Sequence, residues 1–288
     1  MSKHYGKILV AYDGSESAAG ALKEAAELAK LRDSEMLVLT VTHVPEVAME
    51  LMGMGNVEGI ISESADTMLA EGEKLAREAG CKKVKAIMKR GVPFRMILEA
   101  AEQERADLIA MGRRGITRLE RVFIGSATTR VIGQAMCDVM VMPRGGKVGT
   151  RAALVATDGS KCGDNAVARA INFSAAYGVP KLALVSVVDA NDEFMALAPN
   201  AVEKMTEHAR EVVQEAADSA KDAGIKADTM VKTGKPSVGI LDAAKSSGAE
   251  IIFIGTHGRT GLGRMIMGSA TQDLIAISDR PIIVTKSK

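Results

Sequence analysis

The feature that most constrains the fold of this chain is an internal repeat. The segment KILVAYDGS near the N-terminus resembles AALVATDGS in the second half, so that Asp13 aligns with Asp158. Later in each half, KRGVP recurs as KTGKP with nearly the same spacing. A chain of 288 residues that repeats itself in this way predicts two homologous domains. We place them at residues 1–144 and 151–288, joined by a short glycine-containing linker at 145–150.

Short aliphatic runs alternate with segments of helical length within each half. Such nearly continuous runs are typical of strands that are buried on both faces of a parallel sheet. The alternation predicts an α/β fold with two tandem, doubly wound, open parallel five-stranded sheets and helices on both faces, a Rossmann-like arrangement. The expected strands are residues 7–12, 36–41, 84–89, 107–112 and 138–143, and then 152–157, 182–188, 227–232, 250–255 and 281–286.

Helices are expected between these strands, for example at residues 15–31 and 58–80. The clearest helix of the second half carries apolar residues at the i, i+3, i+4, i+7 spacing of one helical face. This stripe predicts a face that packs on the core. Its members are Val202, Met205, Ala209, Val212, Val213, Ala216 and Ala220.

Composition narrows the classes of function. The formal net charge is +1 and aromatic residues make up 3%, so neither charge nor stacking surfaces favour nucleic acid as a partner. No apolar run approaches the roughly 20 residues of a membrane span, so no membrane partner is expected. The 3 cysteines lack paired spacing, which favours a reducing compartment. We therefore predict a cytoplasmic protein.

The tripeptide Asp-Gly-Ser follows the first predicted strand of each half, beginning at Asp13 and at Asp158. In open α/β sheets, ligands gather at the carboxyl ends of the strands. Two interpretations remain open. Either the aspartate begins a turn and the serine caps the next helix, or the carboxylate stands at the mouth of a nucleotide site, where it accepts from ribose or base or helps to hold a metal.

A glycine pattern, Gly-x2-Gly-x9-Gly-Ser, follows the fourth predicted strand of each half. Glycine lets the backbone approach a ligand closely or adopt positive φ, and a helix that starts at the serine offers N–H groups to a phosphate. The intervening residues differ between the copies while the spacing holds, which indicates a geometric constraint. The pattern consists of Gly112, Gly115, Gly125 and Ser126 in the first half, and Gly255, Gly258, Gly268 and Ser269 in the second.

Hydroxyl and basic side chains accompany this pattern. We expect both serines to be N-caps, and Thr128 and Thr271 in the first helical turn to offer a second hydroxyl to a phosphate. The arginines either complement a polyphosphate or belong to a solvated loop. Neither GxxxxGK[ST] nor a GxGxxG after the first strand occurs. The arginines are Arg113, Arg114, Arg118 and Arg121, and then Arg259 and Arg264.

Both halves resemble the universal stress protein family, in its adenine-nucleotide-binding branch. The glycine signature, the DGS after strand one and the duplicated layout carry this resemblance, which spans nearly the whole chain. It implies an adenine nucleotide alpha-hydrolase-like fold and a tandem member that binds ATP, AMP or ADP. It further implies that Asp13 and Asp158 contact the ribose–adenine end and that the backbone of Val41 and Val187 meets the adenine edge. The signature glycines and serines would cradle the phosphates.

The predicted sites also include the neighbours of these residues. His257 lies between two signature glycines, where the family often has histidine and the first half has Arg114. It is a phosphate or metal contact, or an ordinary loop histidine. Mg²⁺ or Mn²⁺ is expected on the phosphates, with no protein side chain as a metal ligand. The neighbouring predicted residues are Ala11, Met111, Arg114, Ala127 and Thr128, and then Ala156, Ile254, His257, Ala270 and Thr271.

The resemblance favours a nucleotide-dependent regulatory module in stress response, with slow or no hydrolysis. The alternative is an ATPase or phosphotransfer enzyme that uses the same sites, with the strand-one aspartates as the only strand-end carboxylates available as bases. We also expect a homodimer, or pairing of the two halves within one chain through the fifth strands, which open with Asp138 and Pro281. The methionine-rich segment 44–59 is a mobile lid, a partner surface or ordinary packing.

Overall fold

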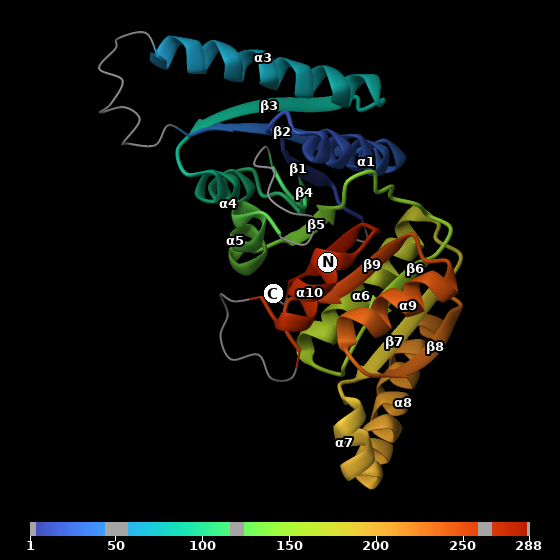
Figure 1. Cartoon of the computed structure of the whole chain (residues 1–288). Coiled ribbons are helices and arrows are strands. Elements are labelled where there is room, and N and C mark those ends of the chain that lie inside the picture. Colours follow the sequence, from blue (N-terminus) through green and yellow to red (C-terminus); the bar gives the residue numbers. More distant parts are fainter. Residues whose placement is uncertain (1–3, 44–56, 116–123, 259–266, 287–288) are drawn as a thin grey trace. The chain divides into compact units, whose positions relative to one another are not determined.

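The chain forms two compact units, Tyr5–Gly145 and a second that contains Gly146–Lys288. The computed structural model describes residues 4–43, 57–115, 124–258 and 267–286. In each unit a parallel sheet lies between helices (Figure 1). Both units use the same order of strands and helices, as the internal repeat predicts.

The first unit contains a five-stranded sheet in the order β3-β2-β1-β4-β5, and every neighbouring pair is parallel. Helices α1 and α3 contact each other on one side of the sheet, while α4 and α5 contact each other on the other (Figure 1). The elements are β1 (Lys7–Ala11), α1 (Glu16–Arg32), β2 (Glu35–Thr42), α3 (Val57–Glu78), β3 (Lys83–Arg90), α4 (Pro93–Gln103), β4 (Leu108–Gly112), α5 (Ser126–Gln134) and β5 (Asp138–Met142).

The second unit has the equivalent order β10-β9-β6-β7-β8, again with parallel neighbours throughout. Its extra short helix α7 precedes the long helix α8. The elements are β6 (Ala153–Ala156), α6 (Lys161–Tyr177), β7 (Leu182–Val188), α7 (Asp192–Leu197), α8 (Pro199–Asp222), β8 (Ala227–Thr233), α9 (Pro236–Ser247), β9 (Ile251–Gly255), α10 (Ser269–Ile277) and β10 (Ile282–Thr285).

The most deeply buried strands are the aliphatic runs found in the sequence. Every residue of β4, β5, β6, β9 and β10 is buried, because helices cover both faces of each sheet. The edge strands β3 and β8 are more exposed and carry more polar residues. The fold class predicted from the alternation of strands and helices is therefore confirmed.

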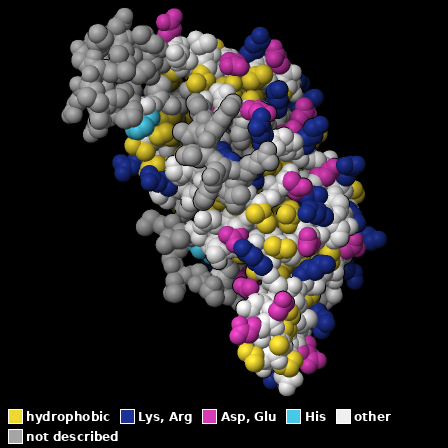
Figure 2. Space-filling view, viewed as in Figure 1, with side chains coloured by type: hydrophobic (Ala, Val, Ile, Leu, Met, Phe, Trp, Pro, Cys, Tyr) yellow, Lys and Arg dark blue, Asp and Glu magenta, His cyan; other side chains and the backbone are white. Residues whose placement is uncertain are grey.

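The apolar stripe on α8 is buried over only part of its length. Its members from Ala209 to Ala220 are buried, whereas Met205 is 40% exposed. The prediction was wrong for Met205 because the first turns of α8, together with α7, extend past the strands of the unit (Figure 1). Hydrophobic side chains, including Phe194 and Leu197, are exposed there (Figure 2).

Candidate functional site

The turn after β1 is built by Asp13, Gly14 and Ser15. Oδ1 of Asp13 accepts a hydrogen bond from the Ser15 N–H at 3.1 Å. Gly14 has a φ of 75°, a left-handed conformation that a side chain would strain. Ser15 is the N-cap of α1, and its Oγ accepts from the Ala18 N–H at 3.1 Å. The interpretation of Asp-Gly-Ser as a turn and helix cap is therefore confirmed in the first unit.

The second unit repeats this turn almost atom for atom. The Ser160 N–H donates to Oδ1 of Asp158 at 3.0 Å, and Gly159 has a φ of 74°. Ser160 caps α6 by accepting from the Gly163 N–H at 3.2 Å. The turn interpretation does not exclude a ligand contact, because only Oδ1 of each aspartate is needed to hold the turn.

The second signature glycine of each unit lies against the other oxygen of that carboxylate. A Cβ at Gly258 would stand 2.6 Å from Oδ2 of Asp158, and a Cβ at Gly115 would overlap Oδ2 of Asp13. A side chain at either position would displace the carboxylate. The structure thus brings together the strand-one aspartate and the glycine signature, which are far apart in the sequence, in both units.

The first signature glycine ends the fourth strand of its unit and packs under the helix that follows strand one. A Cβ at Gly112 would lie 2.9 Å from the carbonyl carbon of Ser17, and a Cβ at Gly255 would lie 2.8 Å from that of Cys162. Carbon atoms in normal contact are about 3.5–4.0 Å apart. None of the six signature glycines has a φ in the left-handed region. Close approach to the helix that follows strand one, and not backbone conformation, is therefore the reason for glycine at positions 112 and 255.

The third signature glycine closes a loop. The Gly125 N–H donates to the carbonyl oxygen of Arg113 at 2.9 Å, and the Gly268 N–H donates to that of Thr256 at 2.9 Å. Each bond joins the start of a helix to the residue that follows the first signature glycine. The intervening residues 116–123 and 259–266, with the arginines predicted there, lie outside the described residues, as do residues 44–56 of the methionine-rich segment.

Helices α5 and α10 begin one residue earlier than predicted. Gly125 and Gly268 are their N-caps, while Ser126 and Ser269 are their first helical residues and are exposed. The prediction that the serines are N-caps was wrong. Because the cap is glycine, no cap side chain accepts from the first-turn N–H groups, in contrast to Ser15 at α1. These N–H groups and the positive end of the helix dipole are available to an anion.

The threonines of the first turn are anchors. Thr128 and Thr271 are 2% and 3% exposed. The Thr128 hydroxyl donates to the carbonyl oxygen of Gly112 at 3.1 Å, and the Thr271 hydroxyl donates to that of Gly255 at 2.9 Å. Their hydroxyls therefore fasten the helix start to the strand end, instead of pointing outward to a phosphate as expected.

The other predicted residues flank these groups at the carboxyl ends of the strands. Ala11 and Ala156 end β1 and β6, and Val41 and Val187 lie near the ends of the neighbouring strands β2 and β7. Both valines are half-buried. Because they lie near the carboxyl ends of their strands, their main chain is at the same end of the sheet as the aspartate turns. Met111 and Ile254 are buried in β4 and β9, and Ala127 and Ala270 follow the exposed serines in α5 and α10.

Charge at the helix start differs between the units. Arg113 and Arg114 of the first unit are half-buried, and burial followed by the neighbouring Arg114 lowers the pKa of the Arg113 guanidinium. The second unit has Thr256 and His257 in their place. Burial, and then the charge of Lys286, lowers the pKa of His257 below its usual 6.5. Its Nε2 is buried and has no hydrogen-bond partner among the described residues. His257 is therefore neutral at pH 7.

Helix α3 contributes side chains that sequence reasoning missed. Met68 packs against Gly14, with its Cε 3.4 Å from the position of a Cβ there. Tyr12, which precedes Asp13, is buried and hydrogen-bonds Glu71. Burial, and then the charges of Glu71 and Asp13, raises the pKa of the Tyr12 phenol. No sequence spacing connects α3 with the strand-one turn, so only the fold reveals these contacts.

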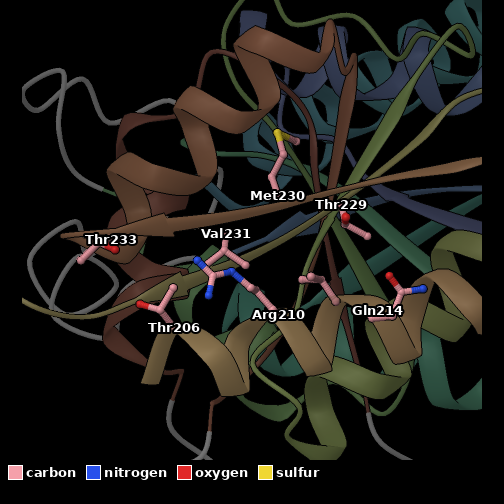
Figure 3. A pocket seen from close by; sticks show the side chains of 8 residues that line it. Thr206, Arg210, Gln214, Thr229, Met230, Val231 and Thr233 are labelled. Carbon is pink, nitrogen blue, oxygen red and sulfur yellow. The ribbon is translucent and has the colours of Figure 1, made fainter. Parts of the chain in front are cut away.

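A separate hollow of about 450 Å³ lies between α8 and the edge strand β8 of the second unit. Arg210 of the helix and Val231 of the strand lie next to each other there, whereas Met230 points away from the helix (Figure 3). No residue predicted for the nucleotide site lines this hollow. Its lining consists of Thr206, Arg210, Val213 and Gln214 from α8, and Thr229, Met230, Val231 and Thr233 from β8.

Two features are absent from the described residues. No helix there has the length and apolar character needed to cross a membrane. No three His, Cys, Asp or Glu side chains within the described ranges gather where they could hold a metal ion. On the visible face of each unit, acidic and basic side chains are interspersed (Figure 2).

Comparisons with known proteins place the chain in a family. The sequence model of the Universal stress protein family matches residues 4–143 and again 149–286. Universal stress protein MJ0531 of Methanocaldococcus jannaschii is 37% identical over 142 residues, which cover 49% of this chain and 83% of that protein. A universal stress protein of Mycolicibacterium smegmatis is 26% identical over 295 residues, which cover 98% of this chain and 97% of that protein.

A solved structure shows the same fold along the full chain. The universal stress protein from Archaeoglobus fulgidus aligns with a TM-score of 0.75 at 24% identity, over 99% of this chain and 97% of that one. The family match covers both halves and accounts for nearly every residue. The chain therefore belongs to the universal stress protein family, as a tandem member with one such domain in each half.

Proposed function

We propose that each unit binds one adenine nucleotide at the carboxyl ends of its strands, and that the chain is a nucleotide-dependent regulatory module in stress response. The observation that carries this proposal is the start of α5 and α10. In both units a glycine caps the helix, an exposed serine follows it, and a hydrogen bond closes the loop from the strand end. Such a helix start binds phosphate through its N–H groups and its dipole.

The surroundings of the helix start fit a phosphate chain. Ser126 and Ser269 offer exposed hydroxyls beside the first-turn N–H groups. Gly115 and Gly258 let the backbone pass directly beside the strand-one carboxylate, where a Cβ has no room. The resemblance to the adenine-nucleotide-binding branch of the family supplies the expectation of ATP, AMP or ADP as the ligand.

The rest of the nucleotide would lie toward the neighbouring strand ends. In this arrangement Asp13 and Asp158 accept from the ribose, and the main chain of Val41 and Val187 meets the adenine edge. Mg²⁺ or Mn²⁺ would ride on the phosphates and neutralise part of their charge. These residues stand at the ends of adjacent strands of one sheet, which supports their joint use.

Binding with slow or no hydrolysis is the activity that we propose for these sites. A general base must lie within about 2.6–3.2 Å of the proton that it removes. Oδ1 of Asp13 and of Asp158 already holds a turn, and Oδ2 lies beside the second signature glycine. We therefore expect slow phosphate release from ATP and Mg²⁺, with the same rate at saturating ATP in Asp13→Ala and Asp158→Ala. Collapse of turnover with nucleotide still bound would establish the enzyme alternative.

Native mass spectrometry of the full chain tests the binding proposal. We expect up to two adenine nucleotides per chain, either as purified or after addition of ATP. The double variant Ser126→Asp with Ser269→Asp should bind none, because each carboxylate repels phosphate while it favours the helix dipole and so preserves the fold. Ser219→Asp, on an exposed part of α8, is the matched control and should bind normally. No nucleotide on the unaltered protein after ATP addition would refute the proposal.

Self-association is a second expectation that follows from the family resemblance. We propose that the chain forms a homodimer or pairs its own two halves, and that nucleotide binding is linked to this pairing. Light scattering after size-exclusion chromatography, with and without ATP, measures the mass directly. A monomer in both conditions contradicts the homodimer.

A further inference from the structure

The two candidate sites carry different charges at matched positions around the same backbone frame. Between the first two signature glycines, the first unit has Arg113 and Arg114 where the second has Thr256 and His257. We infer that the two sites differ in phosphate preference: the first favours a nucleoside triphosphate strongly over a monophosphate, while the second discriminates little between them. This inference rests on the proposed function and deepens it.

The arginines of the first unit are attached to the start of α5. The carbonyl oxygen of Arg113 accepts the hydrogen bond from Gly125, the N-cap. The Cα of Arg114 is 3.5 Å from the position of a Cβ on Gly125. Both residues are half-buried, and the two guanidinium groups are close enough that Arg114 lowers the pKa of Arg113. The main chain of two arginines therefore adjoins the start of the helix whose N–H groups would receive the phosphates.

The second unit keeps the frame but has two uncharged side chains in place of the two arginines. Thr256 accepts the same hydrogen bond from Gly268, and the Cα of His257 is 3.4 Å from the position of a Cβ on Gly268. Threonine is uncharged, and His257 is neutral at pH 7 because burial and Lys286 lower its pKa. The phosphates at this helix start meet N–H groups, the Ser269 hydroxyl and a neutral imidazole, and the nearest cation shown beside that imidazole is Lys286.

The same contrast continues one turn along the helix. Arg130 of α5 lies with its guanidinium carbon 4.9 Å from the centre of the Phe94 ring of α4. Its counterpart in α10 is Asp273, whose carboxylate pairs with Lys235 at 2.7 Å. Both arrangements tie neighbouring helices together. Only the first adds a net positive charge near the helix start, so the contrast in charge extends beyond the signature itself.

At the start of the helix after strand one, the difference in charge between the units has the opposite sign and is smaller. Glu16 in α1 corresponds to Lys161 in α6. Glu16 forms an ion pair with Arg144, so it adds no net negative charge to the first site. Lys161 is exposed and adds one cation to the second site. The first site therefore has Arg113, Arg114 and Arg130 near its helix start, against Lys161 and Lys286 at the second.

Phosphate number is the property that this difference selects. A triphosphate carries more negative charge than a monophosphate and more oxygens that accept from guanidinium groups. One charge-assisted hydrogen bond contributes about a tenfold gain in affinity or more. The preference of the first site should also weaken with salt, because partly exposed charges are screened.

Isothermal titration calorimetry on chains with a single working site tests this inference. Ser269→Asp leaves the first site and Ser126→Asp leaves the second, and each is titrated with ATP and with AMP at low and at physiological ionic strength. At low salt we expect the first site to bind ATP at least about tenfold more tightly than AMP, and the second site to prefer ATP less than about threefold. The preference of the first site should shrink as salt rises.

Exchange of the side chains between the frames is the decisive comparison. Arg113→Thr with Arg114→His should reduce the ATP preference of the first site to that of the second, and Thr256→Arg with His257→Arg should raise that of the second. Each pair of residues occurs in one of the two frames, and because Thr256 is buried beside Cys162, circular dichroism of each exchange variant checks that the fold is kept. Arg32→Thr, which removes one positive charge from the last turn of α1, should change neither preference.

The outcomes separate this inference from the proposed function. Nucleotide bound at both sites with equal ATP preference, unchanged by the exchanges, would overturn the inference and leave the proposed function standing. No nucleotide at either site of the unaltered chain would overturn both. A stronger ATP preference at the second site than at the first would overturn the inference alone.

Discussion

Replacement of Gly112 by alanine tests whether the first signature glycine serves packing. This residue ends β4 beneath α1, and an added Cβ would lie 2.8 Å from the Cβ of Ser17 and 2.9 Å from its carbonyl carbon. The second of these atoms belongs to the main chain of a helix, so it cannot rotate away. We expect Gly112→Ala to destabilise the first unit whether or not nucleotide is present.

The magnitude follows from the overlap. Carbon contacts are normally about 3.5–4.0 Å, so the new methyl must gain roughly 0.6 Å or more by shifting β4 or α1. Overpacking of this kind costs about 1–3 kcal/mol of unfolding free energy. Alanine also reduces the entropy of the unfolded chain, which returns about 0.4–1 kcal/mol. The expected net loss is therefore between about 0 and 2.6 kcal/mol.

Gly20→Ala is the matched control, because this glycine lies inside α1 with no atom within 4 Å of the position of its Cβ. It should stabilise the chain by about 0.5–1 kcal/mol. Hydrogen exchange in increasing urea, read by mass spectrometry, distinguishes the units. Amides of β4 should open at lower urea in Gly112→Ala, while amides of β9 should not change. If Gly112→Ala proves as stable as Gly20→Ala, the packing explanation is wrong.

Three further predictions concern single side chains. Ser15→Ala should destabilise the first unit by about 1 kcal/mol in urea titrations, because α1 loses its side-chain cap. The pKa of His257 lies below its value in the unfolded chain. Its contribution to stability is therefore present above about pH 6.5 and is lost as the pH falls below that value. The urea midpoint of the second unit should decrease between about pH 7.5 and pH 5.5, and the decrease should be smaller in His257→Gln. The pKa of the Tyr12 phenol is raised by burial and Glu71, so the phenol should ionise above about pH 10 in ultraviolet titrations. Its contribution to stability is lost as the pH rises through that pKa. Glu71→Gln should lower the pKa of Tyr12.

The strands and their order along the chain were predictable because the sequence signal of each strand is local. A strand covered by helices on both faces must be aliphatic throughout, and β4 and β9 show this without interruption. Because of the internal repeat, the sequence provides evidence for each strand twice. The extent of burial on α8 was not predictable, because periodicity shows which face of a helix is apolar and does not show where the sheet beneath it ends. Met205 is exposed for that reason.

The candidate site was predictable in its backbone and less so in its side chains. Glycine spacing indicates where the chain must come close to something, and Gly115 does lie against Asp13. The roles of hydroxyls depend on a shift of a single residue. Because α5 is capped by Gly125, Ser126 faces solvent and Thr128 turns inward to the strand end. The spacing of residues along the sequence does not distinguish a glycine cap from a serine cap.

The signature glycines therefore differ in what they say about a ligand. Gly112 and Gly255 are fully explained by the packing of a helix on a strand, so their presence alone would be expected in a domain that binds nothing. Gly125 and Gly268 are different, because their φ values of −59° and −65° are open to any residue and a Cβ there would make only close contacts of 3.3 Å or more. A serine at these caps would satisfy the helix, as Ser15 does in α1. Glycine leaves the first-turn N–H groups to another acceptor, and the argument for phosphate rests on that position more than on the spacing.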